Sequence, residues 1–200
     1  LNNKSLDRVT FTKDRRVITK RYYIPSFIKG IPQIRLSVSR IWNPSKYSSD
    51  DDRDLGIAVR EIEFIDEIPS DGIGFYDWEE IRERHIPEWQ GGFPIRFRWT
   101  GLRASMNADN NIKDSITIFL HVAHPDVEDN PVKVEVIGDN GILREVLLKD
   151  KGWRKVTLSR RELSGTKVLT FQVDRTWNPK LVGVSNDSRD LGVAVAIPDS

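Results

Sequence analysis

The sequence lacks cysteine altogether and has one methionine and three histidines in 200 residues. Without cysteine there are no disulfides, no thiolate metal ligands and no cysteine nucleophile. No apolar run approaches the roughly 20 residues that span a bilayer. Lys and Arg number 31 against 30 Asp and Glu, and this balance argues against a broad nucleic-acid surface, which needs clustered positive charge. Phosphate-binding glycine loops, zinc signatures and a Ser-His-Asp order are also missing, so we expect no cofactor and no bound metal.

Hydrophobic residues make up 38% of the chain, enough to form a core. They alternate with polar residues, as in 95–100, 116–122 and 132–136, and a period of two is typical of half-buried strands. Turn sequences such as Asp139-Asn140-Gly141 separate these segments. We therefore predict an all-β fold, a jelly-roll-like antiparallel β-sandwich, with strands near 73–78, 93–104, 115–123, 132–137, 142–148, 153–158, 168–177 and 191–197. The one helix we expect is short, Asp77–His85, and ends before Pro87.

One motif occurs twice. Trp42-Asn43-Pro44 is matched by Trp177-Asn178-Pro179, 135 residues later, and Asp51-Asp52-Arg53-Asp54-Leu55-Gly56 by Asp187-Ser188-Arg189-Asp190-Leu191-Gly192. The tryptophan precedes the glycine by 14 residues in the first copy and by 15 in the second. Recurrence at near-fixed spacing indicates an internal duplication.

The duplication predicts the domain organisation. We expect a complete β-sandwich unit in 70–200, and in 1–69 a partial β-unit corresponding to the back half of a repeat, with its junction at 68–72. The partial unit would supply strands near 8–12, 16–23, 34–42 and 55–65. Because it leaves a sheet edge and an apolar face uncovered, it must pack on the complete unit, pair with another chain or be completed by further strands; we favour the first.

The repeated motif is interpreted as a structural device. Each copy places an arginine on the apolar face of the strand that leads to its tryptophan, and a guanidinium near a core needs a carboxylate. The downstream motif offers Asp51 or Asp54 in one copy and Asp187 or Asp190 in the other. The alternative is a calcium site in the oxygen-rich loop 49–54. The predicted structural residues are Arg40, Trp42, Asp54, Arg175, Trp177 and Asp190.

Six tryptophans offer platforms for sugar rings. We expect Trp42, Trp99 and Trp177 in the core, whereas Trp78 and Trp89 flank an irregular acidic segment. Trp153 follows a glycine and lies on the face opposite Val156. Arg96, Arg98 and Arg103 share a polar strand face, where they form cross-strand salt bridges or recognise an acidic sugar. The candidate ligand-binding residues are Trp78, Trp89, Trp153, Glu79, Arg96 and Arg98.

Catalysis has weaker support. Glu79, Glu80 and Glu88 could form a glycosidase pair, but charged residues on a short solvated helix are the ordinary explanation, which we favour. His121 and His124 form a His-x-x-His that a strand would place on opposite faces, which argues against a shared metal.

Several motifs together resemble a known kind of module. They are Gly74-Phe75-Tyr76-Asp77-Trp78-Glu79, Phe97-Arg98-Trp99-Thr100-Gly101, Thr176-Trp177-Asn178-Pro179 and Ser188-Arg189-Asp190-Leu191-Gly192-Val193-Ala194-Val195. They resemble an accessory β-sandwich domain, similar to a carbohydrate-binding module, that is appended to glycosyltransferases and methyltransferases of surface-polysaccharide assembly. The resemblance covers most of 74–197 and implies a noncatalytic, carbohydrate-related role. The incomplete first copy departs from a two-site arrangement.

The expected function is thus a noncatalytic carbohydrate-associated binding module of a larger polysaccharide-related protein, with a polysaccharide or other glycan as partner. The alternative is a structural or oligomerisation domain that uses an exposed sheet edge, through self-association or contact with a parent enzyme. The third hypothesis is a jelly-roll glycan-active enzyme that uses carboxylates in 77–88.

Overall fold

The computed structural model describes residues 9, 11, 17–24, 35–47, 49–62, 68–81, 86, 89, 94–108 and 115–198. Its strands are β1 (Ile73–Ile81), β2 (Ile95–Asn107), β3 (Ser115–His121), β4 (Val132–Gly138), β5 (Gly141–Leu148), β6 (Arg154–Ser159), β7 (Val168–Val173) and β8 (Ala194–Ala196). The only helix among the described residues is the 3-10 helix η1 (Pro44–Tyr47). None of the described helices has the length and apolarity to cross a membrane. The predicted all-β fold is confirmed.

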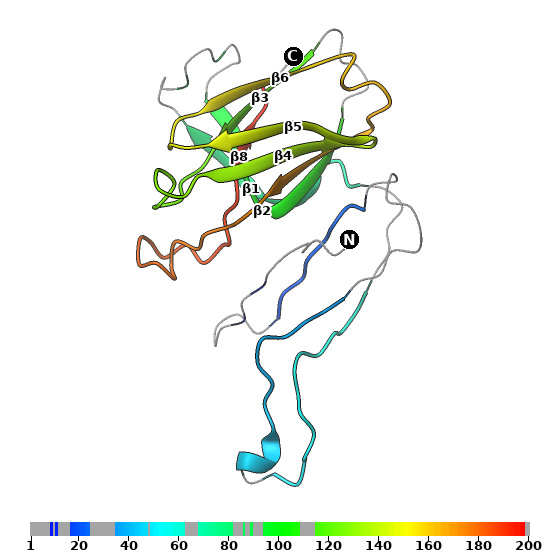
Figure 1. Ribbon diagram of the computed structural model, residues 1–200, viewed down its shortest axis with the longest axis vertical. Helices are drawn as coiled ribbons and strands as arrows, with labels where there is room; N and C mark the ends of the chain where they lie inside the picture. Colours follow the sequence, from blue (N-terminus) through cyan, green and yellow to red (C-terminus); the bar gives the residue numbers. More distant parts are fainter. Residues whose placement is uncertain are drawn as a thin grey trace.

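The strands form one strongly curved antiparallel sheet in the order β5-β4-β7-β2-β8-β3-β6, and β1 also pairs with β2 (Figure 1). Along one edge of β2, Arg98 pairs with Val195 of β8, and further on Arg103 pairs with Gln172 of β7. The opposite edge carries β1, at Trp78↔Arg98 and again at Ile73↔Ser105. The long strand β2 therefore passes from the β8-β3-β6 layer to the β7-β4-β5 layer, as expected of a sandwich of the jelly-roll type.

Two hydrophobic clusters lie on opposite faces of the β8-β3 layer. Ile118 and Leu120 of β3 belong to the main core between the layers, together with Phe171 of β7. Phe119, between them in sequence, belongs to a second cluster on the outer face, which also contains Trp99 of β2. Apolar side chains on both faces explain why β3 reads Ile-Thr-Ile-Phe-Leu instead of alternating strictly.

The described residues before β1 differ from the expected strands. In 35–62 they form a long hairpin that extends away from the sandwich, with η1 near its tip (Figure 1). Its arms are joined by a single antiparallel bridge, Trp42↔Leu55, where we predicted continuous strands at 34–42 and 55–65. Residues 17–23 are not a strand either, contrary to the predicted strand at 16–23. Most of the predicted strand at 8–12 lies outside the described residues. Closer to the sandwich, Tyr23 donates from Oη to Oδ1 of Asp139, 2.9 Å away.

The predicted helix Asp77–His85 is wrong over its described part, because Asp77 to Ile81 continue strand β1. Residues 82–85 lie outside the described part of the chain. Tertiary pairing decides the conformation here: Glu79, Glu80 and Ile81 pair in register with residues 97 to 95 of β2, and this ladder outweighs the weak helical preference of a short acidic segment.

Candidate functional site

The second copy of the repeated motif forms a hairpin that closes the sandwich, residues 177–191. Trp177 and Leu191 exchange backbone hydrogen bonds of 3.0 and 2.8 Å. Inside the loop, Nδ2 of Asn178 donates to the carbonyl of Ser188 at 2.8 Å and to Oδ1 of Asp190 at 3.0 Å. One asparagine side chain thus ties both ends of the loop together.

The first copy makes the same contacts. Trp42 and Leu55 exchange two backbone hydrogen bonds of 2.8 Å. Nδ2 of Asn43 donates to the carbonyl of Asp52 at 2.9 Å and to Oδ1 of Asp54 at 3.1 Å. The two loops therefore use matching residues for matching bonds, although the second is one residue longer.

The charged part of the motif also repeats. Arg53 Nη2 lies 2.7 Å from Asp51 Oδ2, and Arg189 Nη2 lies 2.6 Å from Asp187 Oδ2. In both loops the backbone N–H of the arginine also donates to Oδ1 of that aspartate. Hydrogen bonds from the arginine lower the pKa of each aspartate below its ordinary value. Asp51 and Asp187 therefore each form an ion pair with the arginine of their own loop.

This result corrects the predicted partner of the preceding arginine. Nη1 of Arg175 lies 2.9 Å from Oδ1 of Asp126, and Nη2 donates to the carbonyl of Asn130, so its carboxylate comes from the β3–β4 turn and not from Asp187 or Asp190. Arg40, its counterpart, is exposed. Neither arginine lies within a strand, since β7 ends at Val173 and the arm before Trp42 is not a strand, and the periodicity could not show which turn would fold over Arg175.

The two tryptophans occupy unlike surroundings. Trp177 is half-buried and packs against the outer cluster, with its ring 6.2 Å from that of His124. Trp42 is 53% exposed, and among the described residues its one aromatic ring contact is with Tyr47, at 6.3 Å. The prediction that Trp42 belongs to the core is wrong, whereas Trp99 is buried as predicted.

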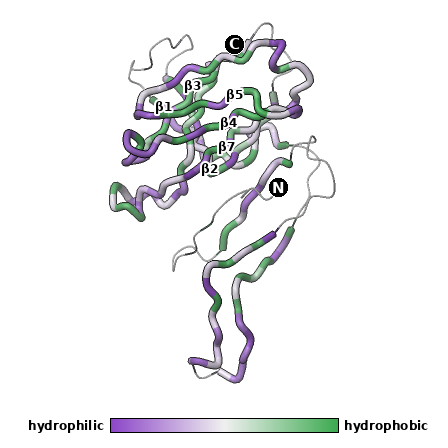
Figure 2. Tube along the Cα trace, viewed as in Figure 1, coloured by the Kyte–Doolittle hydropathy of each residue, from purple (hydrophilic) through white to green (hydrophobic). Residues whose placement is uncertain are grey.

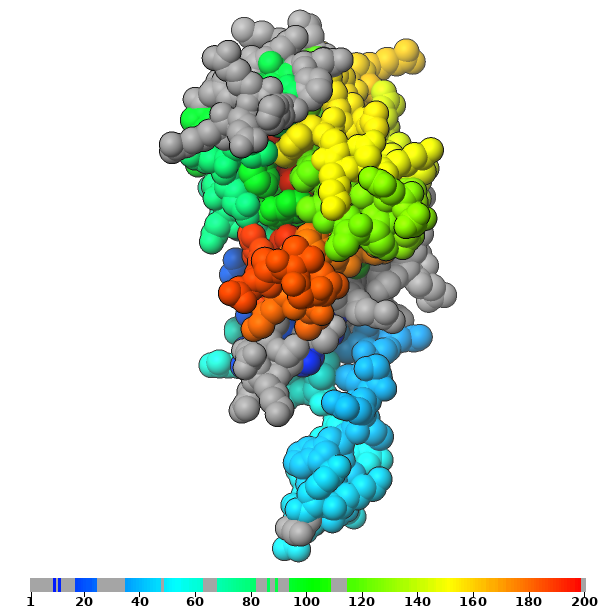
Figure 3. All heavy atoms as spheres, turned by 90° about the vertical axis from the view of Figure 1, so that its left-hand side faces the viewer, coloured from blue at the N-terminus to red at the C-terminus, as the bar shows by residue number. Residues whose placement is uncertain are grey.

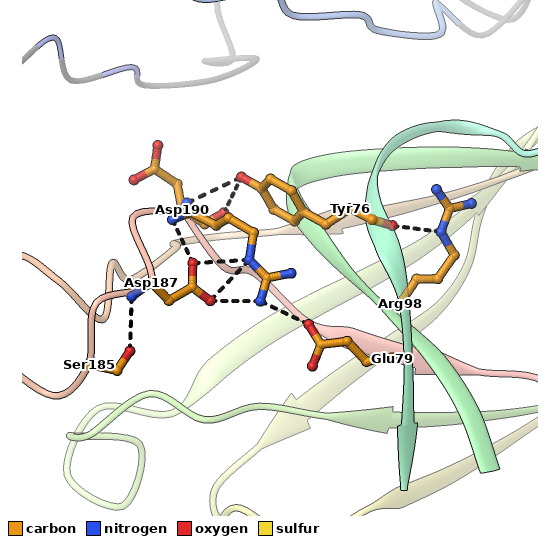
Figure 4. Close-up of polar contacts among 7 residues, drawn as sticks. Tyr76, Glu79, Arg98, Ser185, Asp187 and Asp190 are labelled. Carbon is orange, nitrogen blue, oxygen red and sulfur yellow. Dashed lines mark hydrogen bonds and ion pairs between the residues drawn. The ribbon is translucent and has the colours of Figure 1, made fainter. Parts of the chain in front are cut away.

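The second hairpin is anchored to β1 by a polar network (Figure 4). Arg189 Nη2 reaches Oε1 of Glu79 at 2.8 Å while it holds Asp187, and both carboxylates raise the pKa of its guanidinium. The hydroxyl of Tyr76 donates to the carbonyl of Asp190 and accepts from its N–H, both at 3.2 Å. Glu79, a predicted ligand-binding residue, is therefore part of the contact that fixes the closing hairpin.

Three other predicted ligand-binding residues lie together on the opposite face of β1 and β2. The guanidinium carbon of Arg96 is 4.9 Å from the ring centre of Trp78, and that of Arg98 is 5.3 Å away. Nε of Arg98 donates to the carbonyl of Tyr76 at 2.7 Å, which holds the guanidinium in place. Trp78 is 54% exposed. The pair register, Trp78 opposite Arg98, explains why these side chains meet.

The remaining predicted tryptophans lie elsewhere. Trp153, half-buried, stacks on His121 with ring centres 5.0 Å apart and meets Phe97 edge-on at 5.7 Å. Trp89 packs on Phe119, 5.2 Å between centres. Both belong to the outer cluster, across β2 from Trp78, so the six predicted residues do not converge on one site.

Arg103, predicted on the polar face with Arg96 and Arg98, is buried. Its Nη1 donates to Oε1 of Gln172 at 2.6 Å, and burial lowers the pKa of its guanidinium while Glu135 acts in the opposite direction. A period of two from residues 96 and 98 leads to 100 and 102, so alternation itself places Arg103 on the other face of β2, where it pairs with Gln172 of β7.

The two histidines contact different tryptophans, His121 contacting Trp153 and His124 contacting Trp177. The predicted placement on opposite faces of a strand is wrong, because β3 ends at His121 and both tryptophans pack on the outer cluster. Burial lowers the pKa of His121, and lowers that of His124 to about 4. Among the described residues no three His, Asp or Glu side chains gather in a way that could hold a metal ion.

Comparison with known proteins gives little. No protein-family model and no curated protein matches the chain. Among solved structures, the CBM51-2 and INT domains of Clostridium perfringens ZmpB superpose with a TM-score of 0.34 and 13% identity, over 66% of this chain and 31% of that one. The M60 catalytic domain of ZmpB with its CBM51-1 and CBM51-2 domains gives 0.34 and 13%, over 62% and 13% of the two chains. At this TM-score and identity, the similarity establishes neither the fold nor the function of this chain.

Proposed function

We propose that the protein is a noncatalytic binding module for an acidic glycan, and that Trp78, Arg96 and Arg98 form the binding surface. The observation that carries the proposal is the exposed indole of Trp78, 54% accessible, with the Arg96 guanidinium 4.9 Å from its centre. An exposed aromatic ring offers area on which a sugar can stack, and a guanidinium beside it can pair with a sugar carboxylate.

The strands support this role by holding the side chains of Trp78 and Arg98 in place. Trp78 and Arg98 face each other in the β1–β2 ladder, and the hydrogen bond to Tyr76 fixes the Arg98 guanidinium. Burial lowers the pKa of Arg98, while Asp71 and Asp77 act against this; at neutral pH the guanidinium remains charged. Arg96 is exposed and available to a ligand. Little side-chain entropy would be lost on binding.

The proposal extends to the origin of the protein. The two hairpins arose by duplication. Residues 1–69 belong to an incomplete unit, and residues 70–200 form a complete one. The module serves a larger enzyme of polysaccharide assembly. The matching hydrogen bonds of Asn43 and Asn178 support the duplication. The parent enzyme rests on the sequence resemblance alone.

A glycan array with neutral and acidic oligosaccharides tests the function. We expect acidic glycans to bind, Trp78→Ala to weaken binding at least tenfold, and Arg96→Ala to remove the preference for acidic over neutral sugars. Trp153→Ala is the control, because Trp153 lies across β2 from Trp78, and it should leave affinity unchanged. Absence of binding to every glycan, or equal affinity of wild type and Trp78→Ala, would refute the proposal.

A second candidate function, an interaction domain, is favoured by the exposed apolar side chains of the 35–62 hairpin. The third, a glycan-active enzyme, loses one carboxylate of its set, because Glu79 is paired with Arg189; Glu88 lies outside the described residues.

A further inference from the structure

The two hairpins are alike in sequence and bonding but differ in what covers them. The tip of the second hairpin, residues 180–186, is exposed as well. In Figure 3 this hairpin (orange) lies at the level of the sandwich, while the first (cyan) extends beyond it. The strand that follows each hairpin shows the contrast most clearly. Val193 and Val195 are 0% and 4% exposed, whereas Ile57 and Val59, at the matching positions, are 43% and 51% exposed.

Strand β8, which follows the second hairpin, shows which neighbours a closing strand of this sequence needs. Strand β8 lies between β2 and β3, pairing Ala194 with Trp99 and Ala196 with Phe119. Val193 and Val195 point into the main core, and Ala194 points into the outer cluster. The sequence Val-Ala-Val therefore presents a large side chain to one core and a small one to the aromatic residues of the other.

The glycine that precedes this strand, Gly192, is also required by its surroundings. A Cβ on Gly192 would lie 2.3 Å from the carbonyl oxygen of Gly101 and 2.7 Å from Oγ1 of Thr100, so the backbones approach too closely for any side chain. Gly192 N–H donates to the carbonyl of Thr100 at 2.7 Å. This contact occurs where β2 changes layers, and only glycine fits there.

The first hairpin carries the same sequence without the surroundings that require it. A Cβ on Gly56 would meet only the side chain of Val38, at 3.1 Å. Ala58 is exposed, so nothing around it demands a small residue. Figure 2 shows hydrophobic stretches on both arms of the hairpin. The exposed apolar side chains there include Val38, Ile41, Trp42, Ile57, Val59 and Ile62. Exposed apolar groups of this extent mark an interaction surface.

We infer that residues 55–59 are the closing strand for a second β-sandwich, and that the 35–62 hairpin is the surface through which the protein docks to it. The partner is a sandwich of the same kind in which the position between its own equivalents of β2 and β3 is open. It offers two antiparallel strand edges, an apolar core to receive Ile57 and Val59, and an aromatic face against Ala58. The sandwich of residues 73–196 is not that partner, because β8 already fills the position.

A graft within the full chain tests this inference independently of glycan binding. Residues 42–59 replace residues 177–195, so that the first hairpin must close the existing sandwich. We expect a cooperative thermal transition and native near-ultraviolet circular dichroism, with a midpoint lowered by no more than about 10 °C, as for a few core substitutions of similar size.

The matched control is the same graft with Ile57→Ala and Ala58→Ile. It preserves composition but reverses the two faces of the strand, and we expect it to lose the cooperative transition. A graft that is as unstable as this control would overturn the inference.

A second measurement needs no variant. In the wild-type chain alone, hydrogen exchange should be slow at the amides of Val193 and Val195 and fast at those of Ile57 and Val59. Slow exchange at Ile57 and Val59 would mean that the strand is already paired within the chain, and would equally overturn the inference.

Discussion

His124 is a titratable side chain whose protonation opposes folding. It is fully buried beside Trp177, and burial together with the nearby Arg175 lowers its pKa to about 4, against a smaller effect of Asp126. In the unfolded chain a histidine titrates near 6.5. Between these values the unfolded state binds the proton and the folded state does not, so stability falls as the pH falls from about 6.5 towards 4.

We therefore expect the wild-type protein to lose about 3 kcal/mol of unfolding free energy between pH 7 and pH 4 through this residue. Urea denaturation of wild type and His124→Gln across this range is the measurement. His124→Gln is less stable at pH 7, but its stability should depend less on pH by that amount. Parallel pH profiles for the two proteins would contradict the assignment.

The aspartate of the loop motif should contribute to stability in the second hairpin, where it is Asp187, and not in the first, where it is Asp51. Asp187 holds Arg189, which in turn binds Glu79 of β1, so Asp187→Asn should lower the unfolding free energy by about 1 kcal/mol. The matched variant Asp51→Asn affects a pair with no contact to the sandwich and should leave the midpoint unchanged. Equal destabilisation by both substitutions, measured by chemical denaturation, would argue against the anchoring role of Arg189.

At the scale of elements, the decisive comparison is between the two glycines that precede the closing strands. Gly192→Ala places a methyl group against the Gly101 carbonyl and should cost about 3 kcal/mol through forced backbone movement. Gly56→Ala meets one movable valine side chain and should change stability by less than about 0.5 kcal/mol. Thermal unfolding of the two variants measures this difference, and a destabilising Gly56→Ala would show that the first hairpin is packed in the isolated chain.

The strands of 73–196 were predictable from sequence because each has an apolar face that alternates or a turn that bounds it. The acidic segment 77–81 was not, since Glu79 and Glu80 owe their strand conformation to pairing with β2. The layer change of β2 was equally hidden, whereas the position of Arg103 on the other face from Arg96 and Arg98 follows from its odd number alone. A repeated Leu-Gly-x-Ala-Val predicts two like strands, but sequence alone could not show that only one has neighbours.

The candidate site was predictable only in part. Alternation placed Arg96 and Arg98 on one face of β2, and the register of β1 then brings Trp78 opposite Arg98 and within reach of both guanidinium groups. Glu79, one residue on, necessarily points the other way and meets Arg189. Trp89 and Trp153 approach the opposite face from irregular segments, whose course no periodicity describes.

At the scale of the whole molecule, the two proposed surfaces lie in two different places. Trp78 and its arginines lie on the β1–β2 face, and the 35–62 hairpin extends from the body (Figure 1). A module of this design would bind a glycan on one side while a second sandwich is held by the hairpin. The two activities are separable, because no described contact joins the hairpin to Trp78.

The most direct test of the glycan-binding account uses the indole N–H signals of the six tryptophans. In a nuclear magnetic resonance titration with an acidic oligosaccharide, we predict that the signal of Trp78, assigned through Trp78→Phe, shifts in a saturable manner. Those of Trp42, Trp99 and Trp177 should remain in place. Saturable shifts of Trp89 and Trp153 with an unmoved Trp78 would place the ligand on the opposite face of β2 and contradict the account.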